Sequence, residues 1–204
     1  MKAILMSIRP RHVANILNGI KTLEIRKRFP KDYVGWVYIY CTKDKKYANL
    51  INRGGFLTGM VVARFWCDKV ETFRCNITGN LKDGFFKAKP YCKVIEDGIA
   101  NYNCDDEFED ILKNAQLTNK ELAQYLGDKE CPYGGWYVFN AIHITKLEIF
   151  DKPKEISEFK HLVKYKNCST CPYNHENMDG DICSKCKELK PLARVPQSWC
   201  YIEI

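Results

Sequence analysis

Long hydrophobic runs are absent from this sequence. Apolar runs such as Met60–Ala63 and Trp136–Phe139 are far too short for a membrane-spanning helix, which needs about 20 apolar residues. The first residues, MKAILMSIRPRH, hold an apolar stretch of only about five residues before Pro10, which is too short for the apolar region of a signal peptide. We therefore expect a cytoplasmic protein with no membrane partner.

The sequence also lacks an even set of cysteines. Eleven cysteines without a secretion signal argue against a disulfide framework and favour reduced thiols. Seven of them stand mostly among apolar or aromatic residues and are expected to be small core residues. These seven are Cys41, Cys67, Cys75, Cys92, Cys104, Cys131 and Cys200.

The other four cysteines form two C-x-x-C pairs. Cys168 and Cys171 make the first pair, and Cys183 and Cys186 make the second. Two such pairs predict a tetrahedral structural zinc with thiolate ligands at about 2.3 Å. A site of this kind has no open coordination position, so its predicted role is to staple a segment with little apolar content. An iron–sulfur centre and free thiols are the alternatives.

Acidic residues are scarce at the start of the chain. Residues 1–54 contain twelve Lys or Arg against three acidic residues, a balance of +9, while the whole chain carries +7. This asymmetry favours an anionic partner, with nucleic acid first, a phosphorylated small molecule second and a membrane surface third. The alternative is that the charge only keeps the protein soluble.

Hydrophobic alternation and turn residues predict a mixed α+β domain. We expect strands at 3–8, 22–28, 36–41, 56–65, 69–73, 136–142, 145–150 and 198–204, with a break in the pattern at 151–153. Helices are predicted from Pro10 to Gly19, over 105–113, and after a capping box that begins at Thr118. These elements favour a small, mostly closed mixed β-barrel with covering helices.

The order of these elements also predicts the domain boundaries. We expect a barrel domain over 1–160 with a helical insertion at about 100–130, a four-cysteine zinc-binding segment over 161–195, and a final strand over 196–204 that returns to the barrel.

The stretch NGIKTLEIRKRFP, residues 18–30, combines a helix end with a charged strand. Leu23 and Ile25 share one face of that strand, while Glu24, Arg26 and Arg28 share the other. The charged row is either a solvated face, with a surface ion pair of about 0–1 kcal/mol, or a binding surface.

The stretch MSIRPRHVANILNGIKTLEIRKRFP resembles the N-terminal signature of ASCH domains, which belong to the PUA-like superfamily. The G-x-K-x-x-E-x-R segment of that family is matched here by Gly19, Lys21, Glu24 and Arg26. GMVVARFWCDKVETF, YVFNAIHITKLEIFDKPKEISEF and the ending PQSWCYIEI are similar to later parts of family members. The resemblance implies a PUA-like barrel with a positively charged cleft that binds RNA or a modified nucleobase.

Two functions follow from the resemblance. The first is nucleic-acid binding, with RNA or a modified nucleoside as the partner, through Lys21, Glu24, Arg26, Arg28 and Ser198; Trp36, Tyr38 or Trp199 would stack on a base. The alternative is a hydrolase of the kind that removes the acetyl group of N4-acetylcytidine, or a ribonuclease, with Lys21 and Glu24 as catalytic residues.

The chain departs from the deacetylating members at one position. Those members carry a nucleophilic threonine three residues after the lysine, where this sequence has Glu24. Glu24 would serve as a general base only if burial raised its pKa. His143 is expected to be a hydrogen-bonded structural histidine, and the zinc segment is a further candidate for contact with a protein partner.

Overall fold

A computed structural model describes residues 2–44, 58–80, 85–95, 98–100, 105–127, 135–164 and 187–204. Its helices are α1 (Pro10–Leu17), α3 (Asp105–Ala115), α4 (Asn119–Leu126) and the short 3-10 helix η2 (Ile156–Glu158). The described residues divide into two compact units. The first comprises 1–10, 36–64 and 148–204, and the second comprises 11–35 and 65–147. None of the helices in the described ranges is long and apolar enough to cross a membrane.

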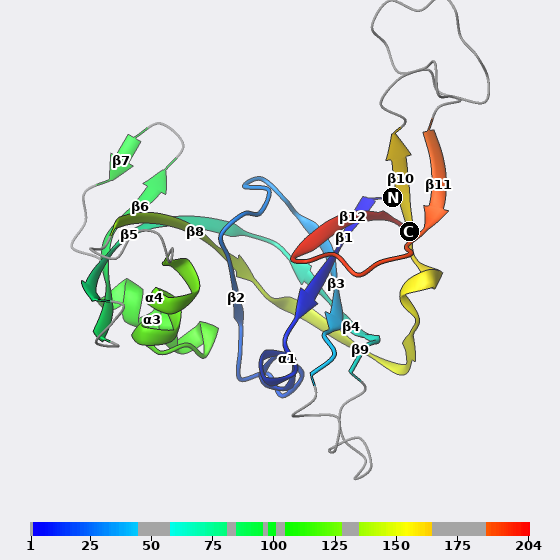
Figure 1. Ribbon diagram of the computed structural model, residues 1–204, viewed down its shortest axis with the longest axis horizontal. Coiled ribbons are helices and arrows are strands. Elements are labelled where there is room, and N and C mark those ends of the chain that lie inside the picture. Colours follow the sequence, from blue (N-terminus) through cyan, green and yellow to red (C-terminus); the bar gives the residue numbers. More distant parts are fainter. Residues whose placement is uncertain are drawn as a thin grey trace, which may run out of the picture. The chain divides into compact units, whose positions relative to one another are not determined.

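A seven-stranded sheet in the order β11-β10-β12-β1-β3-β4-β9 contains most strand residues of the first unit (Figure 1). The strands are β1 (Lys2–Ile8), β3 (Gly35–Cys41), β4 (Val61–Cys67), β9 (Thr145–Lys154), β10 (Lys160–Lys164), β11 (Lys187–Pro191) and β12 (Trp199–Glu203). β1 pairs in parallel with β3 and antiparallel with β12. Leu5 of β1 and its register partner Tyr38 of β3 are buried in a core together with Phe159 and Ile202.

The second unit is built on a five-stranded sheet in the order β2-β8-β5-β6-β7. The strands are β2 (Leu23–Arg26), β5 (Val70–Asn80), β6 (Phe85–Ile95), β7 (Gly98–Ala100) and β8 (Gly135–His143). Leu23 and Ile25 of β2 share a core with residues of α3 and α4, which confirms their predicted role as the buried side of that strand. The two helices lie on one side of β5 and β8 (Figure 1).

The two sheets replace the predicted closed barrel. In the part of the chain that the structure describes, neither strand order returns to its first strand, so the fold is a mixed α+β arrangement of two open sheets. The prediction of a mostly closed barrel was wrong, because period-two alternation identifies strands but carries no information about which strands pair. The predicted domain boundaries stay predictions.

Most predicted elements are present, with two instructive differences. Strand β9 continues through Pro153, where a break was expected. β9 lies at the edge of its sheet, and an edge strand tolerates a proline because one side of the strand needs no ladder hydrogen bond. Strand β6 was missed; it contains Pro90, which lies at a shift in register opposite Cys75. Proline is accepted at such irregular positions, although it argues against a strand in sequence reasoning.

The helix predictions are confirmed more closely. Helix α4 begins after Thr118, whose side chain accepts from the backbone N–H of Glu121, while the Glu121 side chain accepts from the backbone of Thr118. This reciprocal pair is the capping box that the sequence predicts.

Candidate functional site

The turn after α1 positions Lys21. The backbone N–H groups of Ile20 and Lys21 both donate to the carbonyl of Asn15, at 2.9 and 3.0 Å, and satisfy a carbonyl at the end of the helix. Gly19 makes this turn with a φ of +70°, a conformation that favours glycine. A Cβ atom at Gly19 would meet nothing within 4 Å, so the backbone conformation is what requires glycine here.

The side chain of Lys21 is buried against the end of α3. Its Nζ donates to the carbonyl of Ala115 at 2.6 Å, and the residue is only 2% exposed. Ala115 is the last residue of α3, where carbonyl groups lack helical partners and the helix dipole favours a cation. The lysine of the motif is therefore hydrogen-bonded to the last residue of α3, which lies 94 positions further along the chain.

Glu24 lies between two cations. Its Oε2 is 3.2 Å from Lys21 Nζ and its Oε1 is 3.1 Å from Arg26 Nη2. Glu24 is 6% exposed and Arg26 is 9% exposed. We refer to Lys21, Glu24 and Arg26 as the charged cluster. The alternative that Glu24 and Arg26 form a surface ion pair on a solvated face was wrong, since both residues are buried.

Burial and charge act in opposite directions on Glu24. Burial raises the pKa of its carboxyl, but Lys21, Arg26 and His12 together outweigh burial and bring the pKa below its ordinary value. For Lys21, burial lowers the pKa of the ammonium group, and Glu24 opposes that shift. Glu24 is thus an ionised acceptor, which is the opposite of the raised pKa that a general base at neutral pH requires.

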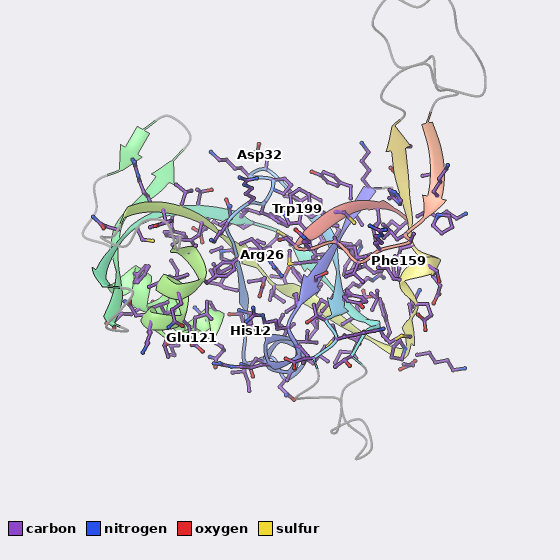
Figure 2. The ribbon with its side chains drawn as sticks, in the orientation of Figure 1. His12, Arg26, Asp32, Glu121, Phe159 and Trp199 are labelled. Atoms are coloured by element: carbon purple, nitrogen blue, oxygen red, sulfur yellow. The ribbon has the colours of Figure 1, made fainter. Side chains whose placement is uncertain are left out.

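His12 is a neighbour that sequence reasoning missed. It lies on α1 (Figure 2), and its pKa is lowered by burial and by Lys21, while Glu24 opposes the shift. Among the described residues, its buried Nδ1 has no hydrogen-bond partner. The adjacent Arg11 pairs with Glu121 of α4 at 2.6 Å and ties α1 to that helix. In the sequence, His12 stands nine residues before Lys21, and this spacing alone does not predict that His12 lies close to the charged cluster.

Asn140 of β8 holds the end of β2. Its Nδ2 donates to the carbonyls of Arg26 and Lys27 at 3.3 and 3.4 Å, and its Oδ1 accepts from the hydroxyl of Thr72 at 3.0 Å. Strand β2 therefore ends at Arg26, and Lys27 begins an exposed connection. We refer to residues 27–31 as the basic loop, because it contains Lys27, Arg28 and Lys31, all exposed.

Other predicted contact residues lie elsewhere. Arg28 is exposed in the basic loop and lies beyond the end of β2, so its expected place on that strand was wrong. Ser198 is a residue of the first unit, and its carbonyl accepts from the N–H of Ser7 at 2.9 Å. His143 is hydrogen-bonded to Glu71 at 2.7 Å, as predicted for a structural histidine.

The aromatic candidates belong to the first unit. Tyr38 is buried in the core of that unit. The ring of Trp36 is covered by the guanidinium of Arg64, whose Cζ lies 4.1 Å from the ring centroid. Trp199 packs edge-on against Tyr201, with ring centroids 5.5 Å apart, and Tyr201 is exposed (Figure 2 labels Trp199).

The structure describes several of the predicted core cysteines but not the four cysteines of the C-x-x-C pairs. Cys41, Cys67 and Cys75 are buried free thiols, and burial raises the pKa of each to about 12, which fits small core residues. Cys168, Cys171, Cys183 and Cys186 lie outside the described residues, so the zinc site stays a prediction. Strands β10 and β11 flank that segment and pair antiparallel, with Lys164 opposite Lys187, so the two ends of the segment are adjacent.

Comparison with known proteins gives a likeness in fold. No protein-family model matches the sequence, and no curated protein sequence matches it. Among solved structures, the chain is similar to the crystal structure of ASCH from Zymomonas mobilis, with 12% identity and a TM-score of 0.49 over 98% of this chain and 87% of that one. A mutant of that protein gives 13% identity and a TM-score of 0.44 over 76% and 77%.

Proposed function

We propose that this protein binds nucleic acid, holding RNA or a modified nucleobase at the charged cluster and the basic loop. The observation that carries the proposal is the position of Glu24, an ionised carboxylate held between Lys21 and Arg26. A carboxylate offers only acceptors and selects for exocyclic amino groups, such as the N4 of cytosine. Two flanking cations keep that acceptor ionised and in place.

The basic loop supplies the second part of the proposed site. Lys27, Arg28 and Lys31 are exposed, and the loop starts where Asn140 holds the carbonyls of Arg26 and Lys27. Exposed lysines and arginines beside a base-reading group are the usual means of contacting phosphates. The loop would position the strand, and the charged cluster would read a base.

Fluorescence anisotropy with a labelled single-stranded RNA and its DNA counterpart tests the proposal at several salt concentrations. We expect the affinity to fall as salt rises, because each phosphate contact releases counterions. The double variant Lys27→Ala/Lys31→Ala should weaken binding at least several-fold at low salt. The matched control, Lys113→Ala/Lys120→Ala, removes two exposed lysines of α3 and α4 and should bind like the wild type.

Two results would contradict nucleic-acid binding. One is the absence of binding to either probe at low salt. The other is binding that does not change with salt, since a site built from lysine and arginine must compete with cations.

A hydrolase is a second candidate, and one observation favours it. Lys21 is buried and its pKa is lowered, as found for lysines that act in catalysis. Incubation with N4-acetylcytidine and with an RNA oligomer provides a direct assay. Turnover that disappears in Lys21→Met, where circular dichroism shows this variant to be folded, and persists in Lys120→Met would support the hydrolase. Turnover that Lys21→Met and Glu24→Gln leave unchanged would remove both residues from any catalytic role.

A further inference from the structure

Tyr125 differs from the other aromatic residues of the second unit in its exposure. Among the side chains of that unit that the structure describes, it is the one exposed aromatic group, at 40% exposure. The aromatic residues expected to stack on a base, Trp36, Tyr38 and Trp199, belong to the first unit. The charged cluster and the basic loop therefore have an exposed ring in their own unit, and it comes from α4.

Helix α4 fixes the position of this ring. Leu122 and Leu126 are 0% and 1% exposed and anchor one side of the helix in the core. Glu121 and Tyr125 are four residues apart, so they are neighbours on another side of the helix. Glu121 pairs with Arg11 of α1 (Figure 2 labels Glu121). The ring is therefore carried by a helix that is packed into the core and tied to α1.

Lys27 of the basic loop lies against the ring. Its Nζ is 5.6 Å from the centroid of the Tyr125 ring, within the range of a cation–π contact. Lys27 directly follows Arg26 of the charged cluster, and Asn140 donates to the carbonyls of both residues. The ring is therefore located where the charged cluster ends and the basic loop begins.

The charges near the ring leave Lys27 available for a phosphate. The acidic neighbour on the same side of α4, Glu121, is paired with Arg11 at 2.6 Å, and Glu24 is held between the two cations of the charged cluster. Lys27 is exposed, and its ammonium group is recorded against the ring and not against a carboxylate of a described residue. A cation–π contact at an exposed site is weak, so a phosphate can replace it.

We propose that Tyr125 is a base-stacking residue, whose ring packs against a nucleobase of a single strand while Lys27 contacts a phosphate of the same strand. This inference rests on the proposed function and deepens it, because it adds a stacked base next to the base that the charged cluster reads. Bases of every kind stack on aromatic side chains, and adjacent cations hold the backbone. The pairing of a ring with a cation is what assigns a nucleotide, since an acidic polypeptide would use the lysine alone.

Two strands with the same phosphates separate stacking from charge. Fluorescence anisotropy at low salt compares a labelled 12-nucleotide oligocytidylate with a strand of equal length whose riboses carry no base. We expect Tyr125→Leu to weaken binding of the oligocytidylate about tenfold and to leave binding of the base-free strand unchanged. Tyr125→Phe keeps the ring and should bind both strands like the wild type. An unchanged affinity of Tyr125→Leu for the oligocytidylate, or an equal loss for both strands, would overturn the proposal.

A tryptophan at the position of the ring reports stacking directly. Tyr125→Trp should bind the oligocytidylate at least as tightly as the wild type. The fluorescence that it adds to that of the wild type should be quenched by the oligocytidylate and not by the base-free strand. Lys120→Trp is the matched control, because Lys120 is also exposed on α4 but lies on a different side of the helix, and its added fluorescence should not be quenched. Equal quenching at the two positions, or none at position 125, would contradict stacking on Tyr125.

The basic-loop variant distinguishes failure of this inference from failure of the proposed function. Lys27→Ala/Lys31→Ala should weaken binding of both strands, since both carry phosphates. If it does so while Tyr125→Leu binds the oligocytidylate like the wild type, Tyr125 does not stack and the proposed function stands. If neither strand binds the wild type at low salt, both fail. If the wild type binds the two strands equally, the surface recognises charge alone, as an acidic polypeptide would also supply, and stacking is overturned.

Discussion

Lys21 Nζ lies 3.2 Å from Glu24 Oε2 at a place where both side chains are almost closed to solvent. Removing one member of such a pair leaves the other as an uncompensated buried charge, which costs far more than losing an exposed ion pair. The charged cluster is therefore both the candidate site and a large term in the stability of the second unit.

Loss of Lys21 should destabilise the protein strongly. We expect Lys21→Met to lower the free energy of unfolding by about 3–5 kcal/mol, because Glu24 and the carbonyl of Ala115 both lose their partner. Urea unfolding followed by circular dichroism measures the change. The control is Lys69→Met, which removes the exposed member of the pair with Glu71. Glu71 keeps its hydrogen bond to His143, so this change should cost about 0–1 kcal/mol. Similar costs for the two variants would contradict a buried pair.

Acid should remove the contribution of Glu24. Its pKa in the folded protein is below the ordinary value of 4.5, so the unfolded chain binds more protons in that range and stability falls as pH drops below about 5. The contribution is fully present above about pH 5 and is lost as the pH falls through the folded pKa. Urea midpoints of the wild type should therefore fall more steeply below pH 5 than those of Glu24→Gln. Parallel curves would show that Glu24 does not titrate below its ordinary range.

His12 should add a second, separate pH dependence. Burial lowers its pKa below 6.5, so its contribution is fully present above about pH 6.5 and is lost as the pH falls through the folded pKa. The groups that act on it are Lys21, Arg11, Glu24 and Glu121. His12→Gln should flatten the dependence of the urea midpoint on pH just below 6.5. A dependence on pH that His12→Gln leaves equal to that of the wild type would contradict this role of His12.

Zinc should be bound in a ratio of one ion per chain. Elemental analysis of the purified protein measures it, and Cys168→Ser or Cys186→Ser should lose most of the metal. Cys200→Ser is the matched control, because Cys200 lies in β12 outside both C-x-x-C pairs. Visible absorbance with bound iron would instead identify an iron–sulfur centre. Zinc retained in both C-x-x-C variants would contradict the predicted ligands.

The sequence predicts local features of the site well. Leu23 and Ile25 were recognised as the buried side of their strand from alternation, and the capping box at Thr118 was recognised from spacing alone. Both features depend on residues within a few positions of one another, which is where sequence patterns are informative.

Burial of the charged residues was not predictable in the same way. Alternation places Glu24 and Arg26 on the face opposite Leu23, and opposite a hydrophobic face one expects water. Their burial depends on distant segments, since Lys21 meets the end of α3 and the end of β2 is held by Asn140 of β8. The effect of Pro153 also depends on distant segments. A proline is tolerated in a strand that lies at the edge of its sheet, and the position of β9 at the edge is set by the other strands of the sheet.

The hydrogen bond from Lys21 to Ala115 also has a consequence for the order of folding. It joins residues 94 positions apart, so the charged cluster cannot be complete until α3 has reached the end of α1. Closing so long a loop is slow compared with forming a local helix or hairpin. Strand β2 also needs β8, at residues 135–143, as its pairing partner. A partly folded or newly synthesised chain can therefore form the local helix α1 before it contains a finished site, and selective binding should appear only in the last stage of folding.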